Sequence, residues 1–363
     1  MIDPPIGEYP CDPWSICRDR GKSSPEWRFE RIPAWKSGLF FCVFRVFRGS
    51  MPSPSVAVID IGSNTIKLLV ATRGRNGGLQ TLTSETIDAR ISAGLGRAVP
   101  RLSEEGMTRG LAAVRELLAV AAAFAPAQTV LVATSAVRDA ANGTEFRERV
   151  RAATGHPLRI LSGDEEANYI GRGLTSDPAL AHLRDFYVFD LGGGSLECLA
   201  FRKRCVTQAL SLPLGCVRLT ERFAADAAAP FSAEAHAAVA NHARRALRES
   251  SFRFDLASQD AVFTGGSMTT ARAIDGLTEG KPLSETAPIV TVATLERILD
   301  RVAALPLAER RQQIAGLPAA RADVFPAALT TMIAVAEVAG VRAFHHSFYN
   351  LRYGLAAELL SGE

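Results

Sequence analysis

From residue 56 onward, short apolar runs alternate with longer segments in which apolar residues recur every three or four positions. The short runs are rich in β-branched residues and predict strands, whereas the longer segments predict amphipathic helices. We expect strands at residues 56–61, 66–72, 79–84, 129–134, 158–161, 186–190, 196–201 and 260–264. We expect helices at residues 103–124, 143–153, 164–174, 232–249, 267–274, 293–303, 307–316, 321–339 and 351–360. This alternation predicts an α/β fold with helices on both sheet faces.

Two of the predicted strands end at an aspartate and then turn through glycine. Asp60 begins the segment Asp-Ile-Gly-Ser-Asn-Thr, and Asp190 begins Asp-Leu-Gly-Gly-Gly-Ser. Backbone N–H groups in such turns point outward and can hold a phosphate. Each aspartate ends a strand beside its loop, where Mg²⁺ would neutralise phosphate oxygens. The candidate phosphate-binding residues are Gly62, Ser63, Asn64 and Thr65 in the first loop and Gly192, Gly193, Gly194 and Ser195 in the second.

The chain continues as a strand after each of these loops. Residues 64–70 alternate back from the first turn, and residues 196–200 continue after the second. A helix should follow the glycines in a Walker P-loop or a dinucleotide-binding fingerprint, so neither motif fits. Two such hairpins, far enough apart for a whole α/β half, predict a duplicated domain that binds phosphate from both sides of a cleft. Lys67 follows the first loop, but strand alternation leaves its direction open.

Length and composition agree with a two-domain globular protein. The 363 residues exceed one compact core, and 47% hydrophobic with 22% charged residues is typical of soluble proteins. The net charge of +3 gives no bulk positive field, so nucleic acid is not expected as a partner. The six cysteines form no C-x-x-C pair and the six histidines no H-x-x-x-H, which disfavours a zinc site or a disulfide framework and fits a cytoplasmic location. We interpret the pair His345-His346 as structural.

The first fifty residues differ from the rest of the chain. Residues 1–50 hold all three tryptophans and half of the cysteines, without a sustained helical or strand period. We interpret them as a poorly ordered extension, or as upstream sequence included by a misassigned start before Met51. The alternative is an arm that binds a membrane surface or a partner. The apolar stretch at residues 38–44 is too short to span a bilayer, and no membrane partner is expected.

Six motifs follow one another in a fixed order. They begin at Asp60 (DIGSNT), Ala133 (ATSAVR), Ile160 (ILSGDEEA), Asp190 (DLGGGSLE), Leu212 (LPLGCVRLTERF) and Thr264 (TGGS). In this order they resemble the exopolyphosphatase and guanosine pentaphosphate phosphatase (Ppx/GppA) family of the actin-like ATPase (ASKHA) superfold. The resemblance runs from about residue 56 to the C-terminus and includes residues 321–326 and 349–354.

The resemblance implies two RNase H-like domains with a phosphate-binding cleft between them. The first domain would comprise residues 51–163 plus about 347–363, and the second residues 164–346. The implied reaction is hydrolysis of a terminal phosphate with Mg²⁺, for which Mn²⁺ is a possible substitute. Longer family members carry further C-terminal helical domains, so we expect a short two-domain form, and we expect a homodimer.

The resemblance also implies roles for single residues. The catalytic glutamate of the family aligns with Glu166, which would act as general base for the attacking water. Arg90 and Arg138 match positions that face the cleft, where arginine suits bidentate binding of phosphate. Leu196 stands where the family usually has threonine, which removes one hydroxyl from the second loop. The implied metal ligands, direct or through water, are Asp60, Asp190 and Glu197.

The residues around Glu166 also have a structural interpretation. Asp164, Glu165 and Glu166 lie in the first turn of a predicted helix, with Ser162 placed to cap it. Acidic residues there are favoured by the helix dipole, by about 0.3 to 1 kcal/mol each. Spacing alone therefore favours capping, and only the place of this cluster in the motif order favours catalysis.

Three functions fit the sequence. The favoured one is a hydrolase that releases the terminal phosphate of inorganic polyphosphate, guanosine pentaphosphate or both. A phosphotransferase or ATPase of the same superfold would need an adenine pocket and an acceptor site. A non-catalytic regulator that binds alarmone or polyphosphate should lack the reactive groups, which are intact here. Gly265, Gly266 and Ser267 open a helix where actin-like kinases contact nucleotide, and they are candidates to bind a nucleotide or distal phosphates.

Overall fold

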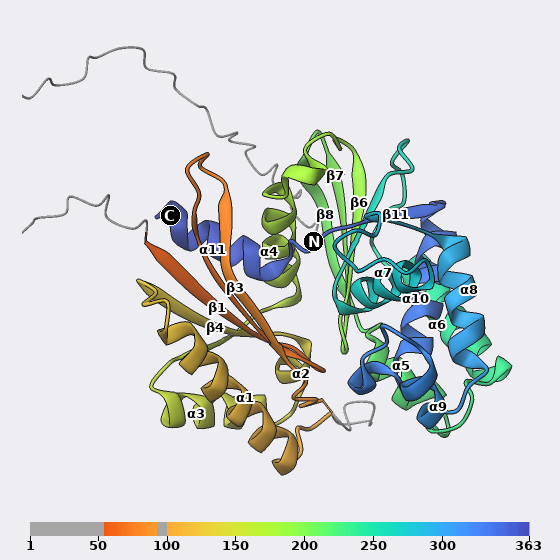
Figure 1. Cartoon of the computed structure of the whole chain (residues 1–363), viewed down its shortest axis with the longest axis horizontal. Coiled ribbons are helices and arrows are strands. Elements are labelled where there is room, and N and C mark those ends of the chain that lie inside the picture. The colour runs from red at the N-terminus through yellow and green to blue at the C-terminus, as the bar shows by residue number, and fades with distance from the viewer. Residues whose placement is uncertain (1–53, 93–99, 363) are drawn as a thin grey trace, which may run out of the picture. The chain divides into compact units, whose positions relative to one another are not determined.

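The computed structural model describes residues 54–92 and 100–362 (Figure 1). The predicted extension at residues 1–50 lies outside this part of the chain. Within the described residues, strands and helices alternate and the strands form two separate sheets, as expected for an α/β fold. No helix in these ranges is long and apolar enough to cross a membrane.

The first sheet is built from the strands on either side of the first predicted loop. Its members are β1 (Ser55–Ile61), β2 (Ile66–Arg73), β3 (Leu79–Ile87), β4 (Gln128–Ala133) and β5 (Leu158–Ile160). Their order is β3-β2-β1-β4-β5, with β1 antiparallel to β2 and parallel to β4. Three helices belong to this sheet, α1 (Glu104–Ala122), α2 (Ser135–Arg138) and α3 (Gly143–Thr154). Val114 of α1 and Phe146 of α3 share a buried core with Ile59 of β1.

The second sheet repeats this plan around the second loop. Its strands are β6 (Phe186–Leu191), β7 (Leu196–Arg202), β8 (Cys205–Leu212), β9 (Ala261–Thr264), β10 (Ile289–Thr291) and β11 (Ala343–His346). Their order is β10-β11-β9-β6-β7-β8, with β6 antiparallel to β7 and parallel to β9. The accompanying helices are α5 (Cys216–Phe223), α6 (Ala233–Glu249), α7 (Gly266–Thr278), α8 (Val292–Ala303), α9 (Leu307–Gln313) and α10 (Phe325–Ala339). The central strands β1 and β6 therefore hold equivalent positions.

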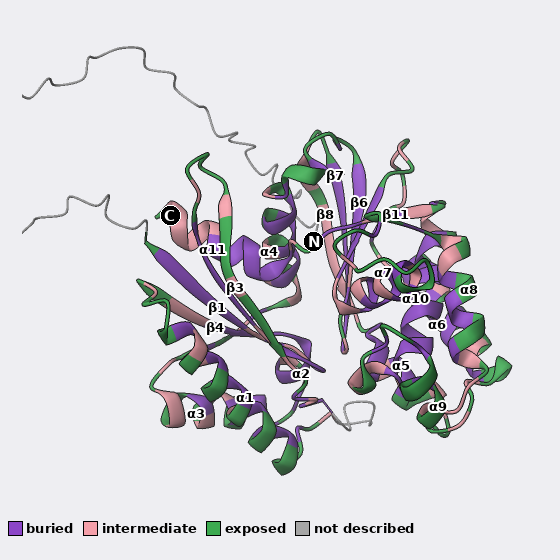
Figure 2. Ribbon diagram, in the orientation of Figure 1, coloured by how far each residue is buried: buried purple, intermediate pink, exposed green. Residues whose placement is uncertain are grey.

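Two helices, α4 (Gly163–Thr175) and α11 (Leu351–Ser361), pack between the sheets. Their apolar residues share one core with Val58 of the first sheet and Val188 of the second. Figure 2 shows buried residues along both helices. The helices cross at glycines, because a Cβ atom at Gly173 would lie 2.1 Å from the carbonyl oxygen of Asn350. A Cβ atom at Gly354 would lie 1.9 Å from the carbonyl oxygen of Tyr169. Backbone contact at this crossing therefore requires glycine.

The sequence pattern missed five short or irregular elements, β8, β10, β11, α2 and α5. β8 is a half-buried edge strand whose polar residues hide the alternation, and β10, β11 and α2 span only three or four residues. The eight residues of α5 are too few for a clear helical period. The predicted helix at residues 321–339 begins only at Phe325, after a 3₁₀ turn over Ala319–Arg321. Pro326 suits that first turn because its missing N–H would be unpaired there.

His346 is structural, as the sequence indicated for the His345-His346 pair. Its Nδ1 accepts a hydrogen bond from Arg272 Nη1 at 3.1 Å, since the guanidinium can only donate. The proton is therefore on Nε2, which lies 3.1 Å from Thr269 Oγ1. Burial, together with the Arg272 charge, lowers the pKa of His346 to about 4. The folded protein thus holds this imidazole neutral.

We expect this neutral imidazole to make stability depend on pH. An unfolded histidine has a pKa near 6.5, whereas the pKa of His346 in the folded protein is about 4. Between these two pH values the imidazole is protonated in the unfolded chain but neutral in the folded chain. The contribution of the neutral His346 to the free energy of unfolding is therefore present above pH 6.5 and is lost as the pH falls from 6.5 to about 4. From pH 7 to pH 5 it should amount to about 2 kcal/mol of unfolding free energy. Urea unfolding of wild type and His346→Gln at both pH values measures it. Equal pH dependence in the two proteins would contradict the assignment.

Candidate active site

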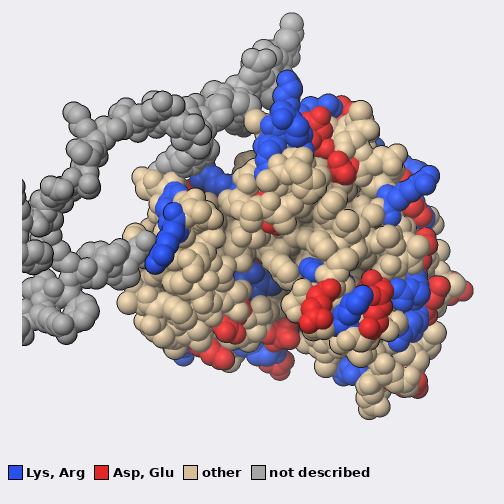
Figure 3. Space-filling view, turned by 45° about the horizontal axis from the view of Figure 1, so that its top comes forward, with Lys and Arg blue, Asp and Glu red and all other residues tan. Residues whose placement is uncertain are grey.

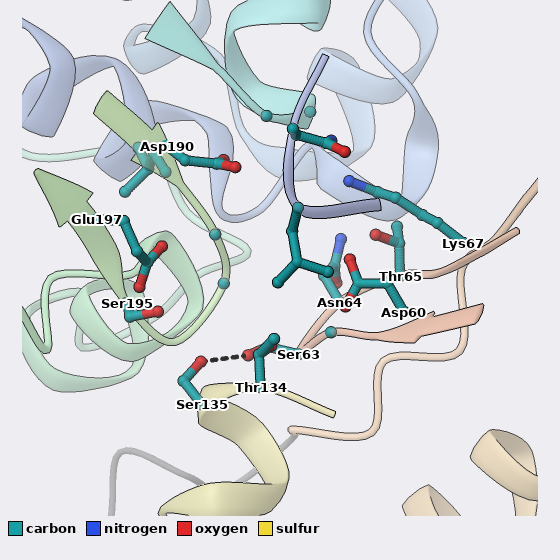
Figure 4. Close-up of a pocket in the computed structure, with 18 of the residues that line it drawn as sticks. Asp60, Ser63, Asn64, Thr65, Lys67, Thr134, Ser135, Asp190, Ser195 and Glu197 are labelled. Carbon is teal, nitrogen blue, oxygen red and sulfur yellow. Dashed lines mark hydrogen bonds between the residues drawn. The ribbon is translucent and has the colours of Figure 1, made fainter. Parts of the chain in front are cut away.

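The two predicted phosphate loops line one cavity, to which both sheets contribute. The hairpin β1–β2 carries the first loop and the hairpin β6–β7 carries the second. Figure 3 shows a hollow in the described surface with Lys or Arg side chains visible in it, and Figure 4 shows how the cavity residues lie. The loop residues that line the cavity are Gly62, Ser63, Asn64, Thr65, Gly192, Gly193 and Ser195. The structure thus brings together two loops more than a hundred residues apart in sequence.

The loops have the same internal turn and lie in close contact. Gly62 N donates to Thr65 O at 3.1 Å, and Gly192 N donates to Ser195 O at 3.0 Å. A Cβ atom at Gly193 would lie 2.7 Å from Ser63 Cβ, so only glycine permits this approach. Gly194 is held equally close, because its Cβ would lie 2.4 Å from Ser135 Oγ. The matching turns support the duplication inferred from sequence.

Three carboxylates and a lysine surround the loops (Figure 4). Asp60 is the last residue but one of β1, and Asp190 is the last but one of β6. Glu197 lies opposite Asp190 in β7 and is 2% exposed. Burial raises the pKa of all three carboxylates. The pKa of Asp190 rises to about 6 and the pKa of Glu197 to about 7. Glu197 Oε1 accepts a hydrogen bond from Ser211 Oγ at 2.8 Å. Lys67, whose direction the sequence left open, also lines this cavity, and burial lowers its pKa to about 8.

This set of residues fits a hard divalent cation that keeps waters and phosphate oxygens among its ligands. Asp60 Oδ1 is buried and has no hydrogen-bond partner among the described residues. Burial raises the pKa of Asp190 and of Glu197 even though Lys67, Arg352 and Arg138 act in the opposite direction, so a cation bound here would favour the ionised carboxylates. No three His, Cys, Asp or Glu side chains in the described ranges cluster closely enough to form a metal site by themselves. Mg²⁺ usually binds through one or two carboxylates and retains several waters, so these observations are compatible.

The two neighbouring glutamates at the start of α4 make different contacts. Glu165 forms the capping box with Ser162: its Oε2 accepts from Ser162 N at 2.8 Å, and its own N–H donates to Ser162 Oγ at 3.1 Å. Glu166 is 6% exposed and lines the cavity. Burial, followed by the charge of Glu197, raises the pKa of Glu166 well above its usual range, against the effect of Arg138. Capping therefore accounts for Glu165 and leaves Glu166 for another role.

The two arginines predicted to bind phosphate are paired with protein groups. Arg138 Nη1 donates to Glu166 Oε2 at 2.7 Å and to Leu161 O at 3.1 Å. Arg90 has a left-handed φ of 45° and forms an ion pair with Asp323. Neither arginine is part of the described lining of the loop cavity. Contact of Arg90 or Arg138 with phosphate thus remains a prediction, and the structure gives Arg138 the different role of holding Glu166.

The third predicted glycine segment also borders the loop cavity. Gly265 and Gly266 line it, with Gly265 at φ 95°, while Ser267 is buried in the first turn of α7. A Cβ atom at Gly265 would lie 2.6 Å from Asp190 Oδ1. A second cavity of about 300 Å³ continues from here and also contains Arg352. The two cavities share Lys67, Gly265, Gly266, Arg321 and Asn350.

The structure adds cavity residues that the sequence did not single out by themselves. Thr134 and Ser135 line the cavity from the start of α2, and Ser63 Oγ lies 3.5 Å from Ser135 Oγ (Figure 4). Arg321 and Asn350 line it from the side of the second sheet and from the cap of α11. All four occur in segments that carry the family resemblance, so the signal was their membership in those motifs.

Comparison with known proteins gives a consistent result. The model of the family described as "Ppx/GppA phosphatase family" matches residues 70–363. A guanosine-5'-triphosphate,3'-diphosphate pyrophosphatase from Vibrio vulnificus is 31% identical over 313 residues. This alignment covers 85% of the chain and 60% of the relative, so the chain spans about three fifths of that protein's length.

Solved structures agree with the fold. The crystal structure of an Aquifex aeolicus Ppx/GppA family member is 24% identical, with a TM-score of 0.70, and the match covers 86% of this chain and 99% of that one. An exopolyphosphatase from Cytophaga hutchinsonii is 23% identical, with a TM-score of 0.75 and coverage of 85% and 98%. These likenesses confirm the α/β fold that the sequence predicted.

Proposed function

The chain belongs to the Ppx/GppA phosphatase family, and we propose that it releases the terminal orthophosphate of guanosine pentaphosphate or inorganic polyphosphate by Mg²⁺-dependent hydrolysis. The observation that carries the proposal is the position of Glu166. Its carboxylate lies in the wall of the cavity that both phosphate loops line, and capping does not account for it. The relatives named for these two substrates support the choice of substrate class.

In the proposed reaction, loop N–H groups and the hydroxyls of Ser63, Thr65 and Ser195 bind the terminal phosphoryl oxygens. A water beside Glu166 attacks phosphorus, its proton passes to the carboxylate, and the bridging P–O bond breaks. The shortened chain leaves with the electron pair of that bond. Because burial raises the pKa of Glu166, its carboxylate is a stronger base than an ordinary glutamate.

Positive charge must balance the phosphoryl oxygens as the bond loosens. Lys67 and Arg321 lie in the cavity lining and supply part of it. Asp60, Asp190 and Glu197 are the residues that would hold Mg²⁺, which supplies the rest when bound. Arg138 keeps the base in place through its bond to Glu166 Oε2.

We expect a phosphate-release screen to separate the candidate functions. Guanosine pentaphosphate, tripolyphosphate, long-chain polyphosphate and ATP are compared at equal concentrations of chain ends, with Mg²⁺, with Mn²⁺ and with excess EDTA. The proposal predicts release from one or more of the first three, loss of that release in EDTA and recovery on adding Mg²⁺. ATP turnover alone would favour the phosphotransferase or ATPase alternative. Tight binding of the first three substrates without release would favour a non-catalytic regulator.

A further inference from the structure

The first residues of helix α5 donate hydrogen bonds to the backbone of the second predicted phosphate loop. Cys216 N donates to Gly192 O at 3.0 Å, and Val217 N donates to Gly193 O at 2.9 Å. Arg218 adds its side chain, since its Nε donates to Gly194 O at 2.9 Å. A planar trans peptide carries its N–H opposite to its C=O. By holding three successive carbonyls, α5 turns the N–H groups of the following residues away from itself.

The other end of the Arg218 side chain reaches the first half of the protein. Its Nη2 pairs with Asp139 Oδ2, in the residue that follows α2. The second oxygen of Asp139, Oδ1, lies 3.5 Å from Arg138 Nε. Arg138 in turn holds Glu166 at 2.7 Å. A continuous chain of polar contacts therefore runs from Gly194 in the second loop to the carboxylate of Glu166.

The position of this chain distinguishes it from an ordinary surface ion pair. Exposed pairs usually contribute little to stability. The Arg218 side chain is 17% exposed and the Asp139 side chain 31%, so this pair is partly exposed, and what sets it apart is its place between the loop and Arg138. Asp139 separates two guanidinium groups that would otherwise face each other with like charge. This series of polar contacts ends at two groups that the proposed reaction uses. One end is the second loop, and the other is the carboxylate of Glu166.

We propose that Arg218 and Asp139 are positioning residues that set the second loop and Glu166 relative to each other across the cleft. This inference rests on the proposed function. Arg218 fixes the loop carbonyls, and Asp139 fixes Arg138 and through it the direction of the Glu166 carboxylate. Neither residue needs to touch substrate. The effect of Asp139 should appear in the turnover number rather than in substrate binding, because misdirecting the base leaves the phosphate ligands in place.

The test is a double-mutant cycle between Asp139→Asn and Glu166→Gln. We measure kcat and KM for phosphate release from guanosine pentaphosphate or tripolyphosphate, whichever the screen selects. In the wild-type background, Asp139→Asn should lower kcat about tenfold, with KM within about twofold. In the Glu166→Gln background the same substitution should change kcat by less than about twofold, because the group it positions is absent. Arg218→Lys, which keeps the charge facing Asp139 but lacks Nε, should lower kcat in both backgrounds through the loop.

A matched control lies one helical turn further along α5. Arg222→Gln removes a guanidinium from the same helix, next to Phe223, and should leave kcat and KM unchanged. Thermal unfolding of every variant shows whether it is folded. An equal loss of kcat from Asp139→Asn in both backgrounds, or no loss in either, would overturn the inference while Glu166→Gln alone still slows release. Wild-type turnover in Glu166→Gln would remove Glu166 from its role and overturn the inference, whereas no phosphate release by the wild-type protein would overturn the proposed function.

Discussion

Glu166→Gln should slow phosphate release by roughly two to four decades, the usual contribution of general acid–base catalysis. The amide keeps the size of the side chain and can still accept a hydrogen bond from Arg138, so the local packing is preserved. It cannot take a proton from water. Binding of the substrate should change little, because the loop residues proposed to hold the phosphate are untouched. Steady-state phosphate release, together with a binding titration of the variant, measures both effects.

Glu165→Gln is the matched control for this substitution. It removes the same charge one residue earlier, where the carboxylate caps α4 and pairs with Arg159. We expect up to about 1 kcal/mol of lost stability and near-normal turnover. If the two variants slowed turnover equally, the acidic cluster would act only on the helix. Near-normal turnover in Glu166→Gln would remove Glu166 from its proposed role.

Gly354→Ala should lower the free energy of unfolding by about 3 kcal/mol, at the upper end of the usual cost of overpacking. In an exposed helix this change would stabilise the protein, since alanine is the better helix former. Here the new methyl group would lie 1.9 Å from the carbonyl oxygen of Tyr169. A backbone atom cannot rotate away, so α4 and α11 must separate. Urea unfolding curves of wild type and variant measure the loss.

Gly78→Ala serves as the reference for this glycine substitution. Gly78 is exposed in the turn between β2 and β3, and its nearest neighbour at 3.4 Å is the flexible side chain of Asn76. We expect a change within about 0.5 kcal/mol, as for most surface substitutions. Similar losses in both variants would mean that the helix crossing tolerates a methyl group and that its backbone contact does not limit packing.

Local signals predicted the parts of the site that are built from contiguous residues. The loops after Asp60 and Asp190 could be found because a strand, an aspartate and glycines occur together in a few residues. The separate roles of Glu165 and Glu166 could not be found from local spacing, because both residues fit the first turn of a helix equally well, and only the family resemblance singled out Glu166. Only the structure shows that the side chain of Glu165 turns back to Ser162 while that of Glu166 enters the cavity.

The partners of the arginines were beyond local pattern. Asp323 follows Arg90 by 233 residues and belongs to the other sheet's half of the protein, so no spacing rule connects them. Arg138 could be recognised as a motif residue, but its bond to Glu166 depends on how α2 packs against the start of α4. The short strands were missed for a related reason. β11 spans four residues, and its pairing with β9 and β10 defines it more than its composition does.

The packing of α11 bears on how the chain acquires its structure during synthesis. This helix covers Val58 and Leu69 of the first sheet, yet it follows β1 by about 290 residues. At the usual 5 to 20 residues per second, translation of that interval takes roughly 15 to 60 s. Throughout that time the apolar face of β1 and β2 has no α11 to cover it. A nascent chain should therefore depend on chaperones or on transient contacts until α11 leaves the ribosome.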